Sequence, residues 1–481
     1  MNAMNAHVLL SLWEVLLVLG AVALVLARWL PPGPRRPATL AAAAMTSSSG
    51  VVLGVLGMRW QMVPVLAGAA LALPFALSPL LRRGARGARR APWWLALPGA
   101  AVCLALVAAG PATAWALPTP VFPEPSGRFA VGTGVLELTD HSRPETATAA
   151  PEDRRTVVVQ LWYPARKTPA GGRPAPYLGR TEHEGHVVCD ALADYSGLPG
   201  FLLDGLPRAR THASYDVPVA EGGDRFPVVL FSPGLGGVRA QNTAWAEELA
   251  SHGYVVAGLD HPYDSAAVVL ADGHTVRTQV SATGDDAEDE RRAVGWTAVR
   301  AADLSFVRAQ LGRMDSGAIA GPLTGRLDTA RVVAAGHSLG GGAALQAARQ
   351  DPEFAAVIDL DGFPHDPDPQ PYRQPVLALT QAIGPDTDPD YLPKLTRVLA
   401  LGGATSYRLT VPGAGHLTFT DAPLYLPPLP SLVGSLGRTQ GPRITAAASL
   451  AFLDATLRPG AADPATALSA YGTLAVHRPG S

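Results

Sequence analysis

The fold is decided by the stretch Arg331-Val-Val-Ala-Ala-Gly336-His-Ser338-Leu-Gly340-Gly-Gly-Ala-Ala-Leu345. Its first part is apolar and favours a buried strand, and its last part is a run of small residues that favours a helix. Between them a Gly-x-Ser-x-Gly turn places Ser338 at the apex, as in a nucleophile elbow. The alternative is a glycine-rich connection with a surface serine, and the pattern alone does not separate the two.

The geometry of this turn explains why both positions are glycine. The turn is strained and its backbone passes close to neighbouring elements, so a Cβ at Gly336 or Gly340 would clash. The strand then holds the Ser338 hydroxyl above the sheet, and the N-terminus of the following helix offers free N–H groups to a developing oxyanion. These features predict nucleophilic catalysis by Ser338.

Charge is distributed unevenly along the 481 residues. The formal net charge is −2, which argues against a nucleic-acid-binding protein. Residues 1–120, however, contain nine Arg, no Lys and a single acid, Glu14, so this part is basic and the remainder is acidic. The two cysteines, Cys103 and Cys189, fall in different parts, so we expect no disulfide and no cysteine-based metal site.

The basic part contains four apolar segments, at residues 8–27, 38–57, 62–81 and 93–117. Each has about 20 residues or more, which is enough for a helix to cross a bilayer core of about 30 Å. We therefore predict a multi-pass transmembrane region over residues 1–117, with the bilayer as its partner. Because Glu14 is the one charged residue inside the segments, a passive anchor is favoured over a transport path.

The arginines of this part set the expected orientation of the segments. Clusters follow the first and the third segment, at Arg28, Arg35, Arg36, Arg82, Arg83, Arg86, Arg89 and Arg90. By the positive-inside rule both loops are cytoplasmic, so both chain ends and everything after about residue 118 lie outside the cytoplasm, in a cell-membrane protein. An alternative is that the fourth segment is a signal peptide that is cleaved near Ala114.

The acidic part has the order of elements of an enzyme domain. After a proline-rich linker at 118–128, we predict one catalytic domain at 129–460. Alternating strands at 130–139 and 156–163 come first, and strands alternate with helices from residue 226 onward. This order predicts an α/β-hydrolase, with a mostly parallel sheet, helices on both faces and an antiparallel edge.

The remaining strands and helices, and the segments expected between them, can be assigned residue ranges. Predicted strands cover 226–231, 254–259, 332–335, 355–361, 375–380 and 405–411, and predicted helices cover 243–252, 297–312, 343–349 and 444–457. Cap or insert segments are expected at 164–225, with a short amphipathic piece around 191–206, and at 262–294, and a C-terminal tail at 461–481. The apolar run 197–203 could be a cap over a pocket, a patch that dips into a membrane, or part of the core. The apolar run 423–430 could guide a lipid chain from the bilayer or act as a lid.

A catalytic serine needs a base, and four histidines follow strands or lie in turns: His261, His337, His365 and His416. His416 follows the last predicted parallel strand, on the loop from which an imidazole reaches the serine of an α/β-hydrolase. It is therefore the predicted base, and a structural histidine is the alternative. His337, inside the elbow, is expected to point away and to give structural support.

The third member of such a triad is a carboxylate at a strand end, between the serine and the histidine in chain order. The run Ile358-Asp359-Leu360-Asp361-Gly362 ends the strand after the elbow. Asp359 and Asp361 belong to one face of that strand, so alternation does not separate them. We choose Asp361, because it is last and can bend over the sheet edge; Asp359 stays as the alternative. Its predicted role is to fix the His416 tautomer and stabilise the imidazolium.

Two backbone N–H groups are expected to bind the oxyanion. One belongs to Leu339, directly after the nucleophile, and the other to Leu235 in the loop Gly234-Leu235-Gly236 that follows an earlier strand. A plain glycine-rich turn is the alternative for this loop. The acids at 359–368 match no calcium loop, so no metal or other cofactor is expected.

Several of these motifs together resemble the platelet-activating-factor acetylhydrolase family of the plasma or isoform II type. They occur in order as Val159-Gln-Leu-Trp-Tyr-Pro164, Phe231-Ser-Pro-Gly-Leu-Gly236, Gly336-His-Ser-Leu-Gly-Gly341, Leu360-Asp361 and Gly415-His416-x-x-Phe419. The resemblance implies a calcium-independent α/β-hydrolase that cleaves short or oxidised acyl esters from the sn-2 position of phospholipids. By position it implies the triad and the oxyanion residues named above, and it favours Asp361 over Asp359.

The chain departs from the family pattern at Pro233, where a histidine is common, at Leu339, where an aromatic residue is common, and in its extra N-terminal region. These departures leave the acyl and head-group preference open. The sequence thus predicts a membrane-tethered serine esterase that acts on lipid-like esters outside the cytoplasm. Its rivals are a broad-specificity carboxylesterase or polyesterase and a non-catalytic membrane sensor or scaffold.

Overall fold

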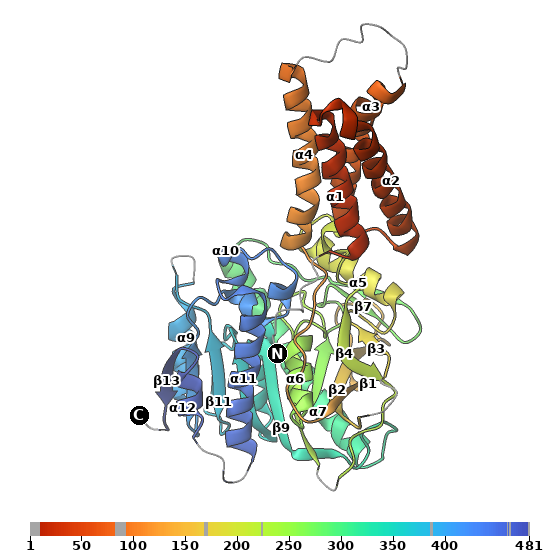
Figure 1. The fold of residues 1–481 in the computed structure, drawn as a ribbon. Helices are drawn as coiled ribbons and strands as arrows, with labels where there is room; N and C mark the ends of the chain where they lie inside the picture. The colour runs from red at the N-terminus through yellow and green to blue at the C-terminus, as the bar shows by residue number, and fades with distance from the viewer. Residues whose placement is uncertain are drawn as a thin grey trace. The chain divides into compact units, whose positions relative to one another are not determined.

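The computed structural model describes residues 10–81, 93–167, 172–222, 225–384, 388–458, 460 and 463–479. The chain divides into two compact units, Met1–Thr119 and Pro120–Ser481, and the first is drawn in red to orange in Figure 1. The arginine loop predicted to be cytoplasmic at Arg82–Arg90 lies outside the described residues. Each unit is described by itself below.

Four helices make up the first unit: α1 Leu12–Leu26, α2 Pro32–Leu56, α3 Val63–Leu81 and α4 Trp93–Ala116. In the described part of this unit, all four are long and apolar enough to cross a membrane, with mean hydropathies of 1.9, 1.6, 1.6 and 1.7. They overlap the four predicted segments, but α1 begins at Leu12 rather than at residue 8, and α2 begins at Pro32 rather than at residue 38. Pro32 and Pro34 lie in the first turn, where proline is tolerated, and Pro37 lies inside the helix, where an apolar helix can also accommodate it.

The acid of the first unit is paired rather than free. Glu14 is 4% exposed, and its two carboxylate oxygens accept hydrogen bonds from Arg59 Nε at 2.7 Å and Nη2 at 2.9 Å. It also accepts from the backbone N–H of Ser11 at 2.7 Å, as part of a capping box at the start of α1. This ion pair joins α1 to the turn before α3. It explains, on structural grounds, why an acid is present in an apolar helix.

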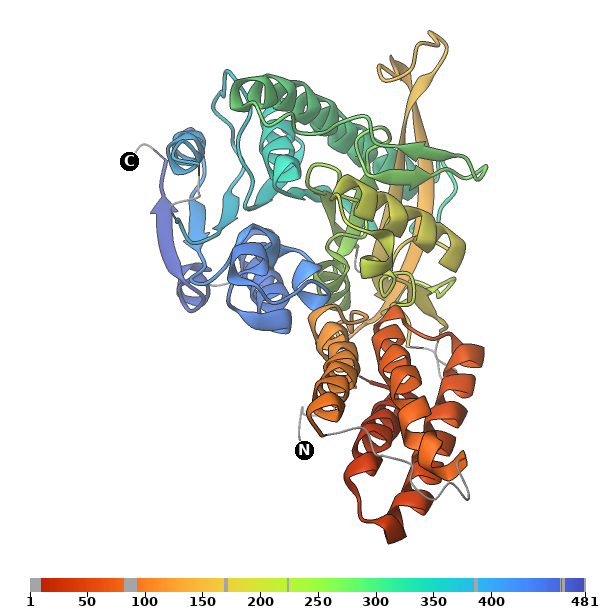
Figure 2. The ribbon, with the colours of Figure 1, turned by 90° about the horizontal axis from the view of Figure 1, so that it is seen from above.

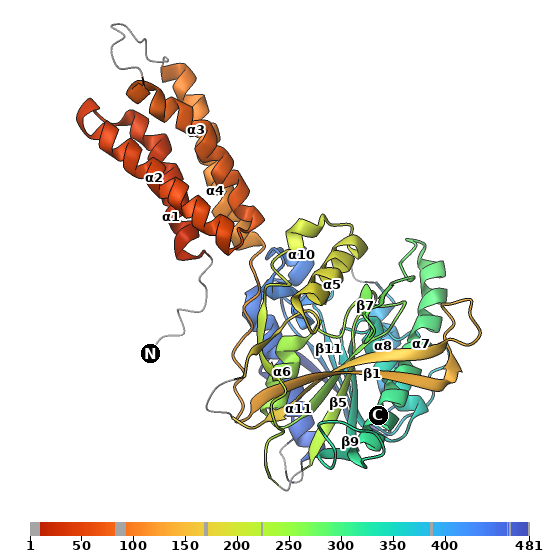
Figure 3. The same cartoon turned by 90° about the vertical axis from the view of Figure 1, so that its right-hand side faces the viewer.

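The second unit is built on an eleven-stranded sheet with the order β13-β12-β11-β10-β9-β5-β6-β2-β1-β4-β3, which Figure 3 shows crossing the unit. Its central strands are parallel. They are β5 Phe226–Ser232, β6 Val255–Asp260, β9 Leu327–His337, β10 Phe354–Leu360, β11 Val376–Thr380 and β12 Ser406–Thr410. The predicted mostly parallel sheet is confirmed.

Antiparallel pairing extends this sheet at both ends. On one side β2 (Arg154–Ala165) pairs with β6 and with β1 (Ala130–Pro144), which confirms the predicted antiparallel edge. Two short strands from the segment predicted as an insert extend the sheet further: β4 (Arg210–Tyr215) pairs with β1 in parallel, and β3 (Pro174–Pro176) pairs with β4 antiparallel. On the other side β13 (Thr473–His477) pairs with β12.

Strand β13 corrects the prediction that residues 461–481 are a tail outside the domain. Its side chains are half-buried or exposed, and its apolar run Leu474-Ala475-Val476 is too short to indicate a strand in the sequence. It follows the short helix α12 (Ala465–Ser469), which carries the chain back to the sheet edge. The last part of the chain therefore covers β12, which would otherwise be an open edge strand.

Helices cover both faces of the sheet (Figure 2). Helices α7 Asp286–Asp315, α8 Leu339–Gln350 and α9 Tyr391–Ala400 pack on one face, in a core that includes Val228 and Leu230 of β5. Helices α6 Thr243–Ser251 and α11 Gly437–Leu457 pack on the other face with Val229 and Phe231. Successive side chains of one buried strand point to opposite faces of the sheet, so the strand contributes to both cores.

Two segments predicted as inserts contain regular structure. Residues 164–225 hold helix α5 (Glu182–Tyr195), where only a short amphipathic piece near 191–206 was expected. Residues 262–294 hold the hairpin of β7 (Ala267–Val269) and β8 (Thr275–Arg277) and the start of α7. Asp285 caps α7, accepting the Glu288 N–H at 2.9 Å. The first turns of α7 are charged and mostly exposed, so no apolar stripe indicates them.

Candidate active site

Ser338 lies between β9 and α8 in the strained backbone that an elbow requires. Its φ is 56° and its ψ is −125°, outside the regions that a non-glycine residue ordinarily adopts. A Cβ on Gly336 would lie 2.1 Å from the Gly340 carbonyl oxygen, and one on Gly340 would lie 2.1 Å from the Ser232 carbonyl oxygen. The Ser338 N–H donates to the Leu360 carbonyl at 3.0 Å, which ties the elbow to β10.

His416 and Asp361 are in direct contact. His416 opens the 3-10 turn His416–Phe419 after β12, and Asp361 follows the last residue of β10. His416 Nδ1 lies 2.6 Å from Asp361 Oδ2. The other carboxylate oxygen accepts the Gln381 N–H at 2.8 Å and the Tyr391 hydroxyl at 3.1 Å. The carboxylate is thus held on both oxygens, and Nε2 of His416 is left as the nitrogen that can take a proton.

Asp359 has a different environment, although it was the alternative acid. It is fully buried, and its Oδ1 accepts the Gly362 N–H at 2.9 Å. Burial, together with the neighbouring Asp361 charge, raises the pKa of Asp359 well above its ordinary value. The structure therefore brings Asp361 to His416 and leaves Asp359 as a neutral group under the turn.

From the sequence we expected His337 to point away from the site, but it lies beside His416. Its ring packs against the His416 ring with centroids 4.6 Å apart. Its Nε2 lies 3.0 Å from the His416 carbonyl oxygen, and its Nδ1 lies 2.9 Å from Gln241 Nε2. Burial and the nearby His416 charge hold the pKa of His337 well below its ordinary value. His337 is thus a neutral hydrogen-bonding link between the elbow and the His416 loop.

The loop after β5 passes directly beside the serine. A Cβ on Gly234 would lie 3.4 Å from Ser338 Cβ. The Gly234 N–H donates to Gln241 Oε1 at 3.2 Å, so Gln241 joins this loop to His337. Leu235 is the next residue of the loop, and Leu339 is the first residue of α8, where helix N–H groups have no partner four residues earlier. Gln241 had no signal in the sequence, because an isolated glutamine in a loop is common.

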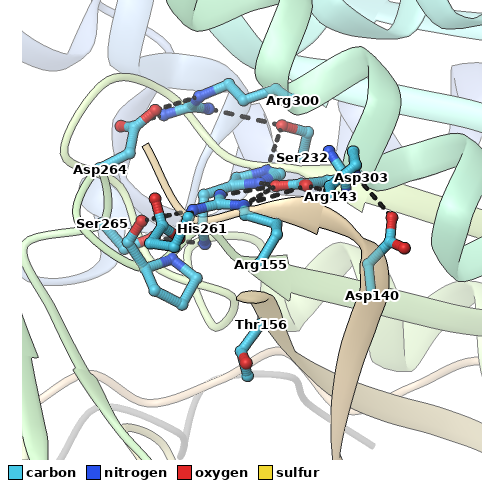
Figure 4. A network of polar contacts seen from close by, with 12 residues as sticks. Asp140, Arg143, Arg155, Thr156, Ser232, His261, Asp264, Ser265, Arg300 and Asp303 are labelled. Carbon is cyan, nitrogen blue, oxygen red and sulfur yellow. Dashed lines mark hydrogen bonds and ion pairs between the residues drawn. The ribbon is translucent and has the colours of Figure 1, made fainter. Parts of the chain in front are cut away.

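A second Ser–His–Asp row lies beneath this loop (Figure 4). Ser232 Oγ lies 2.9 Å from His261 Nε2, and His261 Nδ1 lies 2.8 Å from Asp303 Oδ2. All three residues are fully buried, so a substrate has no access to this serine. Burial lowers the pKa of His261 below its ordinary value, and this effect outweighs the opposite effect of the Asp303 carboxylate. The charge of Arg155 and the hydrogen bond from His261 overcome burial and hold the pKa of Asp303 below its ordinary value.

This internal row was missed from the sequence, although His261 was among the candidate histidines. Its acid lies 42 residues farther on, on the middle of helix α7, where a single aspartate has no distinguishing pattern. His365, the remaining candidate, pairs with Glu290 at 2.9 Å. Among the described residues, no group of three His, Cys, Asp or Glu side chains is placed to hold a metal ion.

The apolar runs 197–203 and 423–430, whose role the sequence left open, each contain a buried and an exposed part. Leu203 and Leu424 are buried in one shared cluster. Leu198, Phe201 and Leu429 are 37%, 52% and 53% exposed. Each run therefore contributes to the core and also leaves large apolar side chains at the surface.

The family follows from a comparison with known proteins. Residues 117–310 and 308–460 match the family model described as platelet-activating factor acetylhydrolase, isoform II. The chain belongs to this family. The match covers the catalytic unit from the linker to α11, so the resemblance inferred from the sequence is confirmed.

Relatives of this acetylhydrolase-family chain are esterases. A probable 1-alkyl-2-acetylglycerophosphocholine esterase of the fungus Arthroderma benhamiae is 30% identical over 63% of this chain and 76% of its own length. The platelet-activating factor acetylhydrolase of Cavia porcellus is 29% identical over 29% of this chain and 35% of its own length. A solved ferulic acid esterase of Streptomyces cinnamoneus is 29% identical, with a TM-score of 0.58, over 74% of this chain and 98% of its own. The chain is a carboxylic ester hydrolase.

Proposed function

We propose that this family member is a membrane-tethered serine esterase that cleaves short or oxidised acyl chains from the sn-2 position of phospholipids. The observation that carries the proposal is the 2.6 Å contact between His416 and Asp361, with the His416 ring packed on the histidine that precedes Ser338. In this role Ser338 is the nucleophile, His416 the base and Asp361 the residue that orients the base.

The reaction then proceeds in two halves. Ser338 Oγ attacks the acyl carbonyl carbon while Nε2 of His416 takes the hydroxyl proton, and the carbonyl electrons move onto its oxygen. Collapse of this intermediate expels the lysolipid alkoxide, which receives the proton from His416. Water next attacks the acyl-enzyme with His416 as base, and release of the fatty acid restores Ser338.

The oxyanion in both halves is assigned to the N–H groups of Leu235 and Leu339. The position of Gly234 against Ser338 Cβ supports Leu235 as one donor, and the place of Leu339 at the start of α8 supports it as the other. Removal of one such donor costs about 10²- to 10³-fold in kcat in serine hydrolases.

The tether in this proposal is the region 1–117, followed by the linker at 118–128, with the catalytic domain on the external face. Four helices of sufficient length and hydropathy support it. A lipid substrate lies in the same surface as such an anchor, so the effective concentration of substrate near Ser338 is raised. A reporter fused to the C-terminus is expected to be active on the external face, and cytoplasmic activity would overturn this orientation.

A fluorophosphonate probe on the intact chain tests the catalytic assignment. We expect covalent labelling at Ser338, loss of labelling in Ser338→Ala, and retained labelling in Ser232→Ala. Ser232 is the matched control, because it also contacts a histidine that contacts an aspartate. Labelling that survives in Ser338→Ala, or none in the intact chain, would refute the proposal.

The ferulic acid esterase relative favours one second candidate, a broad esterase without phospholipid preference. Turnover of a short-chain sn-2 phospholipid, a nitrophenyl ester and a feruloyl ester by the same preparation separates the two. Phospholipid specificity requires the highest kcat/KM on the first substrate. Equal or higher kcat/KM on the other two supports the broad esterase.

A further inference from the structure

Arg300 of α7 is fully buried beneath the loop that follows β5 (Figure 4). Its guanidinium donates through Nη2 to the Gly234 carbonyl at 3.0 Å and through Nη1 to the Pro233 carbonyl. Nη1 also lies 3.4 Å from Ser232 Oγ. Asp264 accepts from Nε at 2.7 Å and from Nη2 at 2.6 Å. All five N–H bonds of the guanidinium thus have an acceptor, three of them within one short loop.

The charge of this arginine is balanced where it lies. Burial by itself would raise the pKa of Asp264, but the charge and hydrogen bonds of Arg300 hold it below its ordinary value. Asp264 is therefore an anion and compensates the cation, as a buried charge requires. Because the ion pair needs only one side of the planar fork, the other side is free to bind the two backbone carbonyls.

The position of these carbonyls fixes the direction of the N–H groups that follow them. In a trans peptide the N–H points opposite to the preceding carbonyl, and no cis peptide bond occurs among the described residues. The Pro233 carbonyl faces Arg300, and the next N–H, of Gly234, accordingly faces away and reaches Gln241 beside His337. The Gly234 carbonyl also faces Arg300, so the N–H of Leu235 points to this same side, where Ser338 lies.

The turn itself supplies one hold on this orientation, because the Gly237 N–H donates to the Gly234 carbonyl at 2.9 Å. The loop is nevertheless flexible by composition. Leu235 lies between Gly234 and Gly236, and Gly236 has a φ of +68°. A peptide flanked by glycines rotates at little steric cost. The hydrogen bond from Arg300 to the same carbonyl adds a second hold against that rotation. It also polarises the peptide with a full charge, which makes the Leu235 N–H a stronger donor.

We propose that Arg300 is a positioning residue that locks the Gly234–Leu235 peptide with its N–H toward the substrate oxyanion. The proposal rests on the proposed function, because it concerns the oxyanion of the Ser338 reaction. It extends that function by assigning the geometry of one donor to a side chain 65 positions away in the chain, on the far side of the loop.

The test compares Arg300 variants of the full-length chain on a nitrophenyl ester. In Arg300→Gln/Asp264→Asn both charges are removed together, so no unpaired charge stays buried. Arg300→Lys keeps a cation beside Asp264 but lacks the planar fork. We expect kcat to fall about 10- to 100-fold in the double variant, less than for outright removal of a donor, and less in Arg300→Lys, with KM changed by less than about threefold.

A second readout reports on the oxyanion itself. An alkyl trifluoromethyl ketone forms a tetrahedral adduct with a catalytic serine, so its inhibition constant should rise by the same factor as kcat/KM falls. Arg308→Gln is the matched control, because Arg308 lies on the same helix and is also ion-paired, with Asp351 at 2.8 Å. It should leave kcat and the inhibition constant within about threefold of wild type.

The outcomes separate this inference from the proposed function. Absence of fluorophosphonate labelling at Ser338 in the wild-type chain would overturn the proposed function and this inference with it. Labelling at Ser338 together with unchanged kcat in a folded Arg300 variant would overturn this inference alone. An increase in KM without a loss of kcat would also overturn it, because the oxyanion exists only after attack.

Discussion

At the scale of single residues, the two aspartates at the end of β10 illustrate how the fold separates groups that the sequence leaves equivalent. Alternation assigns Asp359 and Asp361 to one face. The strand, however, ends at Leu360, and Asp361 has a φ of +52°. This departure from extended backbone carries its carboxylate out to His416, whereas Asp359 stays under the elbow, where burial and the neighbouring Asp361 raise its pKa.

This difference predicts opposite results for two matched substitutions. Asp361→Asn places an amide where His416 needs a carboxylate, so the histidine loses its tautomer and kcat should fall by about 10³- to 10⁴-fold. Asp359→Asn replaces a neutral acid by a neutral amide that still accepts the Gly362 N–H, so kcat should stay within about threefold. Steady-state turnover of a nitrophenyl ester by both variants checks this. A larger loss in Asp359→Asn than in Asp361→Asn would reverse the assignment.

The same scale shows why other parts of the site were beyond sequence analysis. Ser338 and His416 could be singled out because glycines mark the elbow and because the chain order of strands indicates the base loop. Gln241 and Arg300 have no such mark. Both are hydrogen-bonded to Gly234, which is 7 positions from Gln241 and 66 positions from Arg300. A helix or loop residue in isolation does not indicate such a partner.

At the scale of elements, burial explains which strands and helices could be predicted. Every residue of β5, β6 and β11 is buried, and continuous apolar runs marked all three. Strand β13 and the first turns of α7 lie at the surface and are stabilised by pairing and by capping. Strand pairing depends on a neighbour that only the folded chain supplies, so the sequence did not indicate β13. The cap of α7 is local, because Asp285 and Glu288 are three residues apart, and this helix-start signal in the sequence was missed.

Helix α6 contains a buried acid whose ionisation should make the stability depend on pH. Glu247 is fully buried; one oxygen accepts the Ala213 N–H at 2.6 Å and the other has no partner. Burial raises the pKa of Glu247 to about 8, whereas a glutamate in the unfolded chain ionises near about 4.3. Between these values the folded protein binds one more proton than the unfolded chain, so this residue makes stability fall as pH rises, by at most about 1.4 kcal/mol per pH unit.

Glu247→Gln removes this proton from the balance and tests the prediction. The variant should lose less thermal stability than wild type between pH 5.5 and pH 8, as measured by calorimetry of the full chain in detergent. The charge of Glu247 also helps to raise the pKa of the buried Asp421, so the difference between the two slopes reports Glu247 together with this coupling. Equal slopes would show that Glu247 is ionised in the folded state.

At the scale of the whole molecule, the uneven charge of the sequence corresponds to two units of different chemistry. One unit is a set of apolar helices with large apolar side chains exposed, such as Val55 at 81% and Leu12 at 68%. The other is a catalytic unit whose fold matches the ferulic acid esterase over 98% of that chain. In the proposed function the helical unit is an anchor, which places the enzyme at the surface that holds a lipid substrate.

This arrangement predicts that the anchor affects lipid turnover and spares the chemistry. A protease site inserted between Thr119 and Pro120, at the boundary of the two units, allows the catalytic unit to be released after folding in vesicles. Cleavage should leave turnover of a water-soluble nitrophenyl ester within about twofold. It should lower turnover of a short-chain phospholipid in the same vesicles by at least about tenfold, because release removes the high effective concentration at the surface. The chain without the site, treated with the same protease, is the control. If lipid turnover persists after release, the helices serve some purpose other than bringing Ser338 to its substrate.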